Sequence, residues 1–350
     1  FIICDHHLPG PQIPNALAVL DPKRKDCNYP FKELCGCGVG FKLVQALQKH
    51  FKSSELELLI YLDLVAIAIA ADIVPITGEN RTLTFLGLKQ LQNSPRLGLH
   101  LFIKDIKRPL VVRDLVYIIA PRINASGRMD QGINSVELLM SKDQNKILSI
   151  ARSIEFFNTE RKSTEERIVE EALQQIELEE EIENSSTVVY HHSWHKGVIG
   201  IVASRLIEKF YRPTVVITKS GDILAGSARS VSGFDIYSAL KSCEDSMIKF
   251  GGHKYAAGLT LKPEKLNNFK KAFEDYVKEN ILPEQKSPFL NYDLELELNN
   301  LNPKFFRILN QMEPFGPQNS QPVFVTCNCR DAGGSRIVGN NKNHLKLDII

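Results

Sequence analysis

The sequence predicts an α/β protein of several domains, joined by a long helix and ending in a small β-barrel. Short apolar runs typical of buried strands alternate with segments of helical periodicity along most of the chain. Residues 134–183 lack Gly and Pro and are rich in Glu, Lys, Arg and Leu, which favours long helices. The last segment alternates apolar and polar residues with the period of two that half-buried strands show.

We expect four parts, with boundaries where composition and periodicity change: residues 1–133, 134–185, 186–285 and 286–350. The first opens on a strand end at 1–4 and continues with helices near 39–50 and 56–72. The second is a helical connector. For the third we expect strands near 188–190, 213–218 and 223–229 and helices near 197–210 and 235–243. The fourth is a truncated, OB-like barrel.

The chain starts inside one strand pattern, without an initiator Met, and stops inside another. We therefore expect a fragment of a longer protein. The hydrophobic fraction of 43% and the charged fraction of 24% are typical of a folded globular chain rather than a disordered or fibrous one. The longest apolar run, residues 64–71, is too short to cross a bilayer, and no secretory signal pattern is present.

The cysteines argue against a disulfide framework. Their odd count of seven, scattered over a mid-sized chain, favours a reducing, cytoplasmic location. Cys27, Cys35 and Cys37 lack the second pair that a structural zinc site normally needs, so zinc is the less favoured alternative.

A polar tripeptide, Asp5-His6-His7, directly follows the first strand. Ligands of α/β sheets bind beyond the carboxyl ends of strands, so these side chains are expected to face a site. One imidazole can ligate a metal and the other can contact a substrate, while the carboxylate fixes a ring tautomer or adds an oxygen ligand. An isolated tripeptide of this kind can also be ordinary exposed polar sequence.

Two aspartates, Asp63 and Asp72, bracket the apolar run 64–71. Asp63 is either the N-cap of the helix, a position that Asp favours, or a buried carboxylate that needs a cation or a metal as partner. The residues alone leave both interpretations open.

Four clusters combine small residues, which allow close backbone approach, with cationic or hydroxyl donors suited to phosphate. The candidate residues are Arg122, Asn124, Ser126, Arg128, His195, Ser227, Arg229, Ser230, Gly251, Gly252 and His253. Trp194 offers a ring on which a base could stack. Each cluster alone could be an ordinary turn, but four together indicate a phosphate-containing ligand. The net charge of +2 does not decide the question.

In this order the motifs resemble those of the DHH family of phosphoesterases. The strings are CDHHLPG (4–10), LDLVAIAIAADIVPITGENR (62–81), PRINASGRM (121–129), SWHKGVIGIVASRL (193–206), GSARS (226–230), GGHKYAAG (251–258) and MEPFGPQN (312–319). The resemblance covers nearly the whole chain and is greatest to the branch that degrades single-stranded DNA. It implies a partial DHH phosphoesterase domain, a long connecting helix, a DHHA1 α/β domain and a partial OB-like β-barrel.

The resemblance implies a two-metal phosphodiesterase that uses Mn²⁺ or Mg²⁺ and digests single-stranded DNA from its 5′ end in recombination and repair. Under it, His6 and Asp63 are metal ligands, Asp5 supports them, and His7 acts at the scissile phosphate. The phosphate-suited residues would bind the DNA backbone. Single-stranded DNA is the implied partner, a single-strand-binding protein or a helicase is the candidate protein partner, and no membrane is involved.

Two departures from the family pattern bear on activity. The family's earlier motifs, an Asp-x-Asp segment and a further Asp-bearing strand, would precede Phe1, so we expect this chain alone to bind metal poorly and to be inactive. Ala228 stands where the family's GSGRS-like turn has glycine, which would add strain of about 1 kcal/mol if the position requires a positive φ.

Three alternatives compete with this interpretation. A DHH enzyme for short oligoribonucleotides or cyclic dinucleotides would generally end after the DHHA1 domain, whereas β-rich sequence continues beyond Asn291 here. A non-catalytic DNA-binding relative would be expected to lose the site residues, which are present. An unrelated α/β protein with coincidental strings is disfavoured by the number of independent matches.

Overall fold

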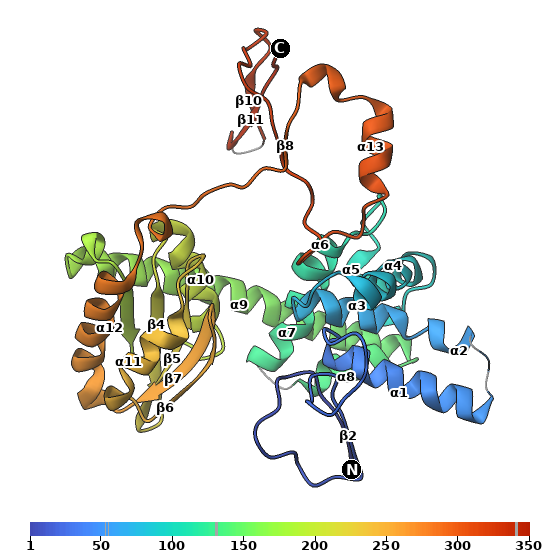
Figure 1. Cartoon of the computed structure of the whole chain (residues 1–350), viewed down its shortest axis with the longest axis horizontal. Helices are drawn as coiled ribbons and strands as arrows, with labels where there is room; N and C mark the ends of the chain where they lie inside the picture. The colour runs from blue at the N-terminus through green and yellow to red at the C-terminus, as the bar shows by residue number, and fades with distance from the viewer. Residues whose placement is uncertain (53, 55, 130–131, 340–341) are drawn as a thin grey trace. The chain divides into compact units, whose positions relative to one another are not determined.

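The computed structural model describes residues 1–52, 54, 56–129, 132–339 and 342–350 (Figure 1). They form two compact units, one of Phe1–Pro121 with Leu290–Ile350 and the other of Arg122–Phe289. Among these residues, no helix combines the length and the apolar composition of a bilayer span. The first unit contains the Asp5-His6-His7 turn, and the second contains the predicted phosphate-binding residues.

The first unit begins with a parallel strand pair, β1 (Ile2–Cys4) and β2 (Ala18–Leu20). Its helices are α1 (Gly36–Phe51), α2 (Leu56–Leu59), α3 (Leu62–Ala71), α4 (Gly78–Asn93), α5 (Leu97–Ile103), α6 (Val112–Asp114), the π-helical η1 (Leu115–Ile119) and α7 (Ala120–Met129), in which the unit boundary falls. The helix expected at 39–50 is confirmed as part of α1. The single helix expected at 56–72 is instead two helices, α2 and α3, separated by exposed residues at 60 and 61.

Local contacts explain where α1 begins and where α3 ends. Cys35 is the N-cap of α1, since its Sγ accepts a hydrogen bond from the Gly38 amide at 3.3 Å. Helix α3 is apolar on nearly all sides and most of it is buried, as expected of a helix surrounded by protein. Asp72 is its C-cap, and the next residue, Ile73, has a left-handed φ of 57°.

The C-terminal segment contains less sheet than its period-two pattern predicts. Its elements are β8 (Leu294–Glu295), η6 (Leu298–Asn300), α13 (Pro303–Asn310), β9 (Phe324–Val325), β10 (Arg336–Val338) and β11 (His344–Lys346). β8 pairs with β9 and β10 with β11 in two separate sheets, so the described residues close no barrel. An alternating pattern shows which side chains share a face, but not whether a partner strand is present.

The second unit is built on a five-stranded sheet of order β3-β4-β5-β7-β6. Its helices and strands are α8 (Ile133–Met140), α9 (Gln144–Leu178), β3 (Thr187–His191), α10 (Ile199–Phe210), β4 (Thr214–Ser220), β5 (Ile223–Arg229), α11 (Ile236–Ser242), β6 (Lys249–His253), β7 (Ala256–Leu261) and α12 (Leu266–Asn280). Short 3₁₀ turns are η2 (Glu181–Glu183), η3 (Glu244–Ser246), η4 (Pro263–Lys265) and η5 (Pro283–Gln285). β3 and β4 are parallel, and the other pairs are antiparallel. The strands and helices expected in this region are confirmed.

Alternation along β4 places the sheet between two helical layers. Val215 and Ile217 face a core shared with Phe269 and Phe273 of α12, whereas Val216 faces a core shared with α9 and α10. All five side chains are fully buried. Burying a side chain of this size stabilises the fold by about 1.5–3 kcal/mol relative to leaving it exposed, so both layers hold the sheet in place.

A buried guanidinium links the segment that follows α9 to the sheet. Arg212, which lies between α10 and β4, donates from Nε to Thr187 Oγ1 at 2.7 Å. Its Nη1 donates to Ile182 O at 2.7 Å and its Nη2 to Glu181 O at 2.8 Å. Burial lowers the pKa of Arg212, and the nearby carboxylates of Glu274 and Glu181 oppose that shift.

We expect Arg212→Ala to lower the free energy of unfolding by about 4 kcal/mol, because four oxygen acceptors, Asn184 O among them, lose their donor at about 1 kcal/mol each. Urea denaturation followed by circular dichroism measures the change. As a control, Arg167→Ala removes an exposed ion pair with Glu171 and should cost less than about 0.5 kcal/mol. Equal effects of the two substitutions would contradict the anchoring role of Arg212.

Candidate functional sites

A histidine beyond the end of β1 and an aspartate at the end of α3 meet in the first unit. His6 Nε2 lies 3.1 Å from Asp72 Oδ2. The His6 side chain is 14% exposed and the Asp72 side chain is 45% exposed, so solvent reaches the pair mainly at the carboxylate. His6 Nδ1 is buried and has no hydrogen-bond partner in the part of the chain that the structure describes.

Asp5 organises the turn that contains both histidines. Its Oδ1 accepts hydrogen bonds from the amides of His6 at 2.7 Å and His7 at 3.2 Å. The same oxygen lies 2.8 Å from His7 Nδ1, and this side-chain hydrogen bond lowers the pKa of Asp5 to about 2. Asp5 is therefore ionised at neutral pH and accepts the proton of His7 Nδ1, which leaves Nε2 of the exposed ring as the acceptor in its neutral form.

The structure does not bring Asp63 to His6. Asp63 lies in the first turn of α3, fully buried, with Oδ2 2.8 Å from Arg96 Nε. Burial raises its pKa, and the charge of Arg96 opposes that shift. Nine residues of helix rise about 13 Å, so Asp63 and Asp72 occupy opposite ends of α3 and only Asp72 reaches His6. The N-cap of α3 is Tyr61, so Asp63 is not a cap either.

The His6–Asp72 pair fits a divalent metal. Imidazole nitrogen and carboxylate oxygen are ligands that Mn²⁺ and related ions accept, and the unpaired buried Nδ1 shows that the ring is not satisfied by protein alone. No set of three or more His, Cys, Asp or Glu residues suited to a metal occurs among the described residues. The described residues therefore offer two ligands at this point, with Asp5 and His7 on the adjoining turn.

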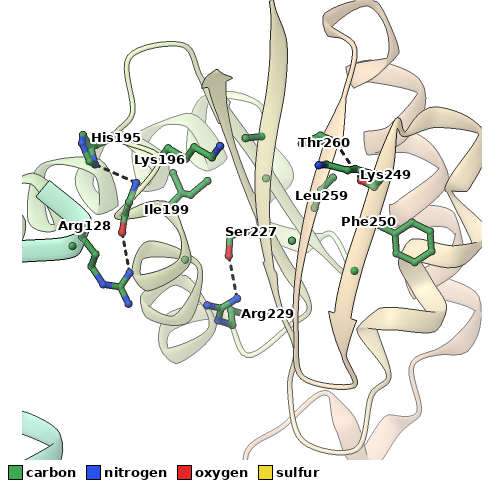
Figure 2. A pocket seen from close by; sticks show the side chains of 17 residues that line it. Arg128, His195, Lys196, Ile199, Ser227, Arg229, Lys249, Phe250, Leu259 and Thr260 are labelled. Carbon is green, nitrogen blue, oxygen red and sulfur yellow. Dashed lines mark hydrogen bonds between the residues drawn. The ribbon is translucent and has the colours of Figure 1, made fainter. Parts of the chain in front are cut away.

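The second unit contains a cavity of about 870 Å³ beside the sheet (Figure 2). Its walls are the start of α10, strands β5, β6 and β7, and the end of α7. The residues that line it are Gly127, Arg128, His195, Lys196, Gly197, Ile199, Gly200, Ala225, Gly226, Ser227, Arg229, Lys249, Phe250, Gly251, Gly258, Leu259 and Thr260. Cationic and small residues predominate, as phosphate binding requires.

Two guanidinium groups reach this cavity without a carboxylate partner. Arg229 Nη1 donates to Ser227 Oγ at 3.0 Å and to Ala228 O at 2.8 Å. Arg128 Nη1 donates to Gly197 O at 2.9 Å (Figure 2). Burial lowers the pKa of Arg229, and the charge of Arg128 lowers it further. Within the described residues neither arginine forms an ion pair, so a bound anion would relieve their mutual repulsion.

Glycines allow the backbone and the guanidinium to approach closely. A Cβ on Gly200, in the first turn of α10, would lie 2.9 Å from Arg229 Nη2 and 3.0 Å from Ser227 Oγ. Gly200 thus lets Arg229 lie against the amino end of α10, where helix amides favour negative charge. Gly252 has a φ of 151°, and a Cβ there would overlap the carbonyl oxygen of Ala256.

Five predicted phosphate-binding residues line the cavity: Arg128, His195, Ser227, Arg229 and Gly251. His195 Nδ1 accepts a hydrogen bond from the Gly197 amide at 3.2 Å, which orients the ring. Prediction missed Lys196, Lys249 and Phe250. Lys196 lies in the quoted string SWHKGVIGIVASRL (193–206) but was not chosen as a candidate residue. Lys249 and Phe250 gave no local signal, because their place depends on the pairing of β6 with β7.

The other predicted residues do not line this cavity. Arg122 is paired with Glu155, with Nε 2.7 Å from Oε2, and Ser126 is fully buried. Ser230 Oγ donates to Phe234 O at 2.9 Å. Asn124 lines a separate cavity of about 540 Å³ next to Arg128. Gly252 and His253 lie further along β6 and are exposed, outside the lining.

Two further expectations need correction. Trp194 cannot stack on a base, because it is 4% exposed, packs in a core cluster and donates from Nε1 to Glu171 Oε2 at 2.7 Å. Ala228 carries no strain of the expected kind, since it lies in strand β5 rather than in a turn and does not have a positive φ.

Three family models match the chain. The DHH family N-terminal domain matches residues 1–69, the DHHA1 domain matches residues 183–279, and the RecJ OB domain matches residues 292–350. Among curated proteins, the single-stranded-DNA-specific exonuclease RecJ of Bacillus subtilis is 37% identical over 99% of this chain and 44% of its own length. RecJ of Salmonella typhimurium is 34% identical over 92% of this chain and 60% of its own length.

Solved structures agree with these matches. RecJ of Thermus thermophilus in complex with Mn²⁺ has a TM-score of 0.83 at 30% identity, covering 99% of this chain and 51% of that one. An exonuclease RecJ bound to manganese has a TM-score of 0.66 at 31% identity, covering 81% of this chain and 70% of that one. The chain spans about half the length of the curated relatives it matches.

We expect Asp72→Asn to weaken Mn²⁺ binding by the full-length protein on the order of tenfold or more, because the His6–Asp72 pair loses its charged carboxylate ligand. Electron paramagnetic resonance of free Mn²⁺ during titration measures the affinity. Asp63→Asn is the matched control on the same helix, and it should leave Mn²⁺ affinity unchanged while lowering the free energy of unfolding by about 3–5 kcal/mol, because it breaks the buried pair with Arg96. The opposite ranking would restore Asp63 as the ligand.

Proposed function

The chain belongs to the RecJ family of DHH exonucleases, and on that basis we propose that it takes part in metal-dependent hydrolysis of single-stranded DNA. The observation that carries the proposal is the cavity of the second unit, which Arg128 and Arg229 line without forming an ion pair with any described carboxylate. A phosphodiester chain supplies the anions that such a site lacks. The His6–Asp72 pair of the first unit supplies metal ligands for the same chemistry.

At the first site, we assign His6 and Asp72 as metal ligands, with Asp72 in the role that the motif had suggested for Asp63. Bound divalent ions polarise phosphoryl oxygens and lower the pKa of a bound water for in-line attack. Asp5 holds the turn and fixes the proton of His7 on Nδ1. His7 Nε2 then faces solvent, where it can bind the scissile phosphate or exchange a proton with it.

At the second site, Arg229, Arg128 and Ser227 would bind DNA phosphates. Ser227 Oγ and the two guanidinium groups provide several donors around one space, a geometry that suits a terminal phosphate with its extra charge. Digestion from the 5′ end, in recombination and repair, is the corresponding proposal for the whole protein. With all seven cysteines as free thiols, we place the protein in a reducing compartment such as the cytoplasm.

Single-stranded DNA is the proposed substrate, and a single-strand-binding protein or a helicase remains the candidate protein partner. An oligoribonucleotide or cyclic-dinucleotide phosphodiesterase is the weaker alternative, because a RecJ OB domain model matches residues 292–350. A non-catalytic role is also weaker, because the Asp5-His6-His7 turn and Asp72 are in place.

We expect the full-length protein to release nucleotides from single-stranded DNA only with Mn²⁺ or Mg²⁺ present, because no described group replaces a metal at the His6–Asp72 pair. A 5′-labelled oligonucleotide resolved by gel electrophoresis follows the reaction. His6→Ala should abolish cleavage while single-strand binding persists. Activity that survives EDTA, equal digestion of duplex DNA, or wild-type turnover by His6→Ala would refute the proposal.

We expect Arg229→Gln to weaken binding of a 5′-phosphorylated single strand on the order of tenfold or more, since a charge-assisted contact of about 1.5–3 kcal/mol is lost. Fluorescence anisotropy without metal measures the affinity. Lys219→Gln removes one positive charge from the exposed side of β4, outside the cavity, and should change the affinity less than about twofold. Equal losses would mean that the cavity is not the phosphate site.

A further inference from the structure

We propose that residues 311–319, here called the docking loop, position the Asp72 carboxylate through contacts with Arg81 and Ile76. The inference rests on the proposed function, because it concerns the geometry of the His6–Asp72 site. It makes Arg81 a positioning residue, since no contact of Arg81 with either member of the pair is present among the described residues.

The backbone conformation directly after Asp72 needs support from other residues. Asp72 ends α3, and Ile73 has a φ of 57°, a conformation that β-branched residues rarely adopt. Such a backbone persists only where its surroundings over-determine it. The Ile73 side chain is 69% exposed and supplies little packing, so the restraint must come from the next residues, up to the start of α4.

On one side, Asn80 restrains this segment. Asn80 is fully buried in the first turn of α4, and its Nδ2 donates to Pro75 O at 2.9 Å and to Glu33 O at 2.6 Å. Glu33 lies just before α1, and a Cβ on Gly36 at the start of α1 would lie 3.6 Å from the His6 ring. Asn80 thereby links the segment after Asp72 to the segment that packs near His6.

On the other side, the docking loop covers the segment. The Ile76 amide donates to Pro317 O at 2.7 Å, and the Ile76 side chain is fully buried. A Cβ on Gly316 would overlap Ile76 Cδ1, so the glycine lets the loop backbone pack directly on Ile76 without displacing that side chain. Without the loop, the Ile76 amide would lose its acceptor and the side chain its cover, four residues from Asp72.

Arg81 holds the docking loop to α4. Its Nη2 lies 3.3 Å from Gln311 O, 3.1 Å from Met312 O and 3.1 Å from Glu313 O. Three carbonyl dipoles therefore converge on one cationic nitrogen, and Arg81 forms no ion pair with a carboxylate among the described residues. Within the loop, Asn319 Nδ2 donates to Met312 O at 3.1 Å, which keeps the carbonyls aligned.

Asn80 and Arg81 are neighbours in the first turn of α4. Asn80 hydrogen-bonds to the segment after Asp72, and Arg81 hydrogen-bonds to the docking loop that covers this segment. Releasing Arg81 would free the loop, unpair Ile76 and let Asp72 depart from the 3.1 Å approach to His6. Affinity for the metal at that pair should fall, while binding of DNA phosphates in the second unit should not change.

The test uses full-length protein carrying Arg81→Ala. Titration with Mn²⁺ alone, followed by electron paramagnetic resonance without DNA, should show affinity weakened on the order of tenfold, as for other residues that orient metal ligands. The Mn²⁺ concentration for half-maximal nuclease activity should rise by the same factor, with activity at saturating Mn²⁺ within about twofold of wild type. Single-strand binding measured by anisotropy should be unchanged.

Arg108→Ala is the matched control, because Arg108 lies in the same unit and pairs with Asp114 instead. It should lower the melting temperature without changing Mn²⁺ affinity. If Arg81→Ala behaves in the same way, with wild-type Mn²⁺ affinity, the positioning role is refuted. Absence of any metal-dependent nuclease activity in the wild type would instead refute the proposed function.

A second variant covers failure of Arg81→Ala to fold. Arg81→Gln keeps a polar side chain at this position but removes the cationic nitrogen on which the three carbonyls converge. Amide hydrogen exchange at residues 73–77 should be faster in this variant than in wild type, together with weaker Mn²⁺ binding. Unchanged exchange there, in a variant that has lost the loop contacts, would overturn the inference on its own.

Discussion

The approach of His6 Nε2 to Asp72 Oδ2, at 3.1 Å, requires the end of strand β1 and the end of helix α3 to meet in the first unit. One partner follows a short strand that is held by parallel pairing with β2, and the other ends a helix surrounded by apolar side chains. Neither element alone defines the contact. The turn organised by Asp5 and the segment fixed by Asn80 both have to be in place for nitrogen and oxygen to meet.

Two kinds of charged side chain can be distinguished among the described residues by whether an opposite charge compensates them. The Asp63 carboxylate is buried against Arg96, and Arg122 is paired with Glu155, so neither charge is available to a ligand. The guanidinium groups of Arg128 and Arg229 are different, because their hydrogen bonds to described residues go to backbone carbonyl and hydroxyl oxygens in a glycine-lined cavity. A protein site that gathers like charges without partners is prepared for an ion of the opposite sign.

Local signals in the sequence were sufficient where the structure depends on neighbours along the chain. Helix α11 begins where Asp235 caps the amides of Tyr237 and Ser238, and the strands of the second unit follow their apolar runs. Local signals were insufficient where the structure depends on contacts between segments far apart in the sequence. Neither β2 nor α13 was anticipated, and Lys249 and Phe250 line the cavity because of the pairing of β6 with β7.

The sequence by itself indicated the α/β character, and its motif strings, by their resemblance, indicated the family. It also placed Asp5-His6-His7 after a strand and supplied five of the residues that line the cavity of the second unit. The folded chain was needed to establish that Asp72 rather than Asp63 meets His6, and that Trp194 belongs to the core. The difference arises because a helix separates two residues of one motif by about 13 Å. Spacing along the chain does not reveal which end of that helix packs against the strand.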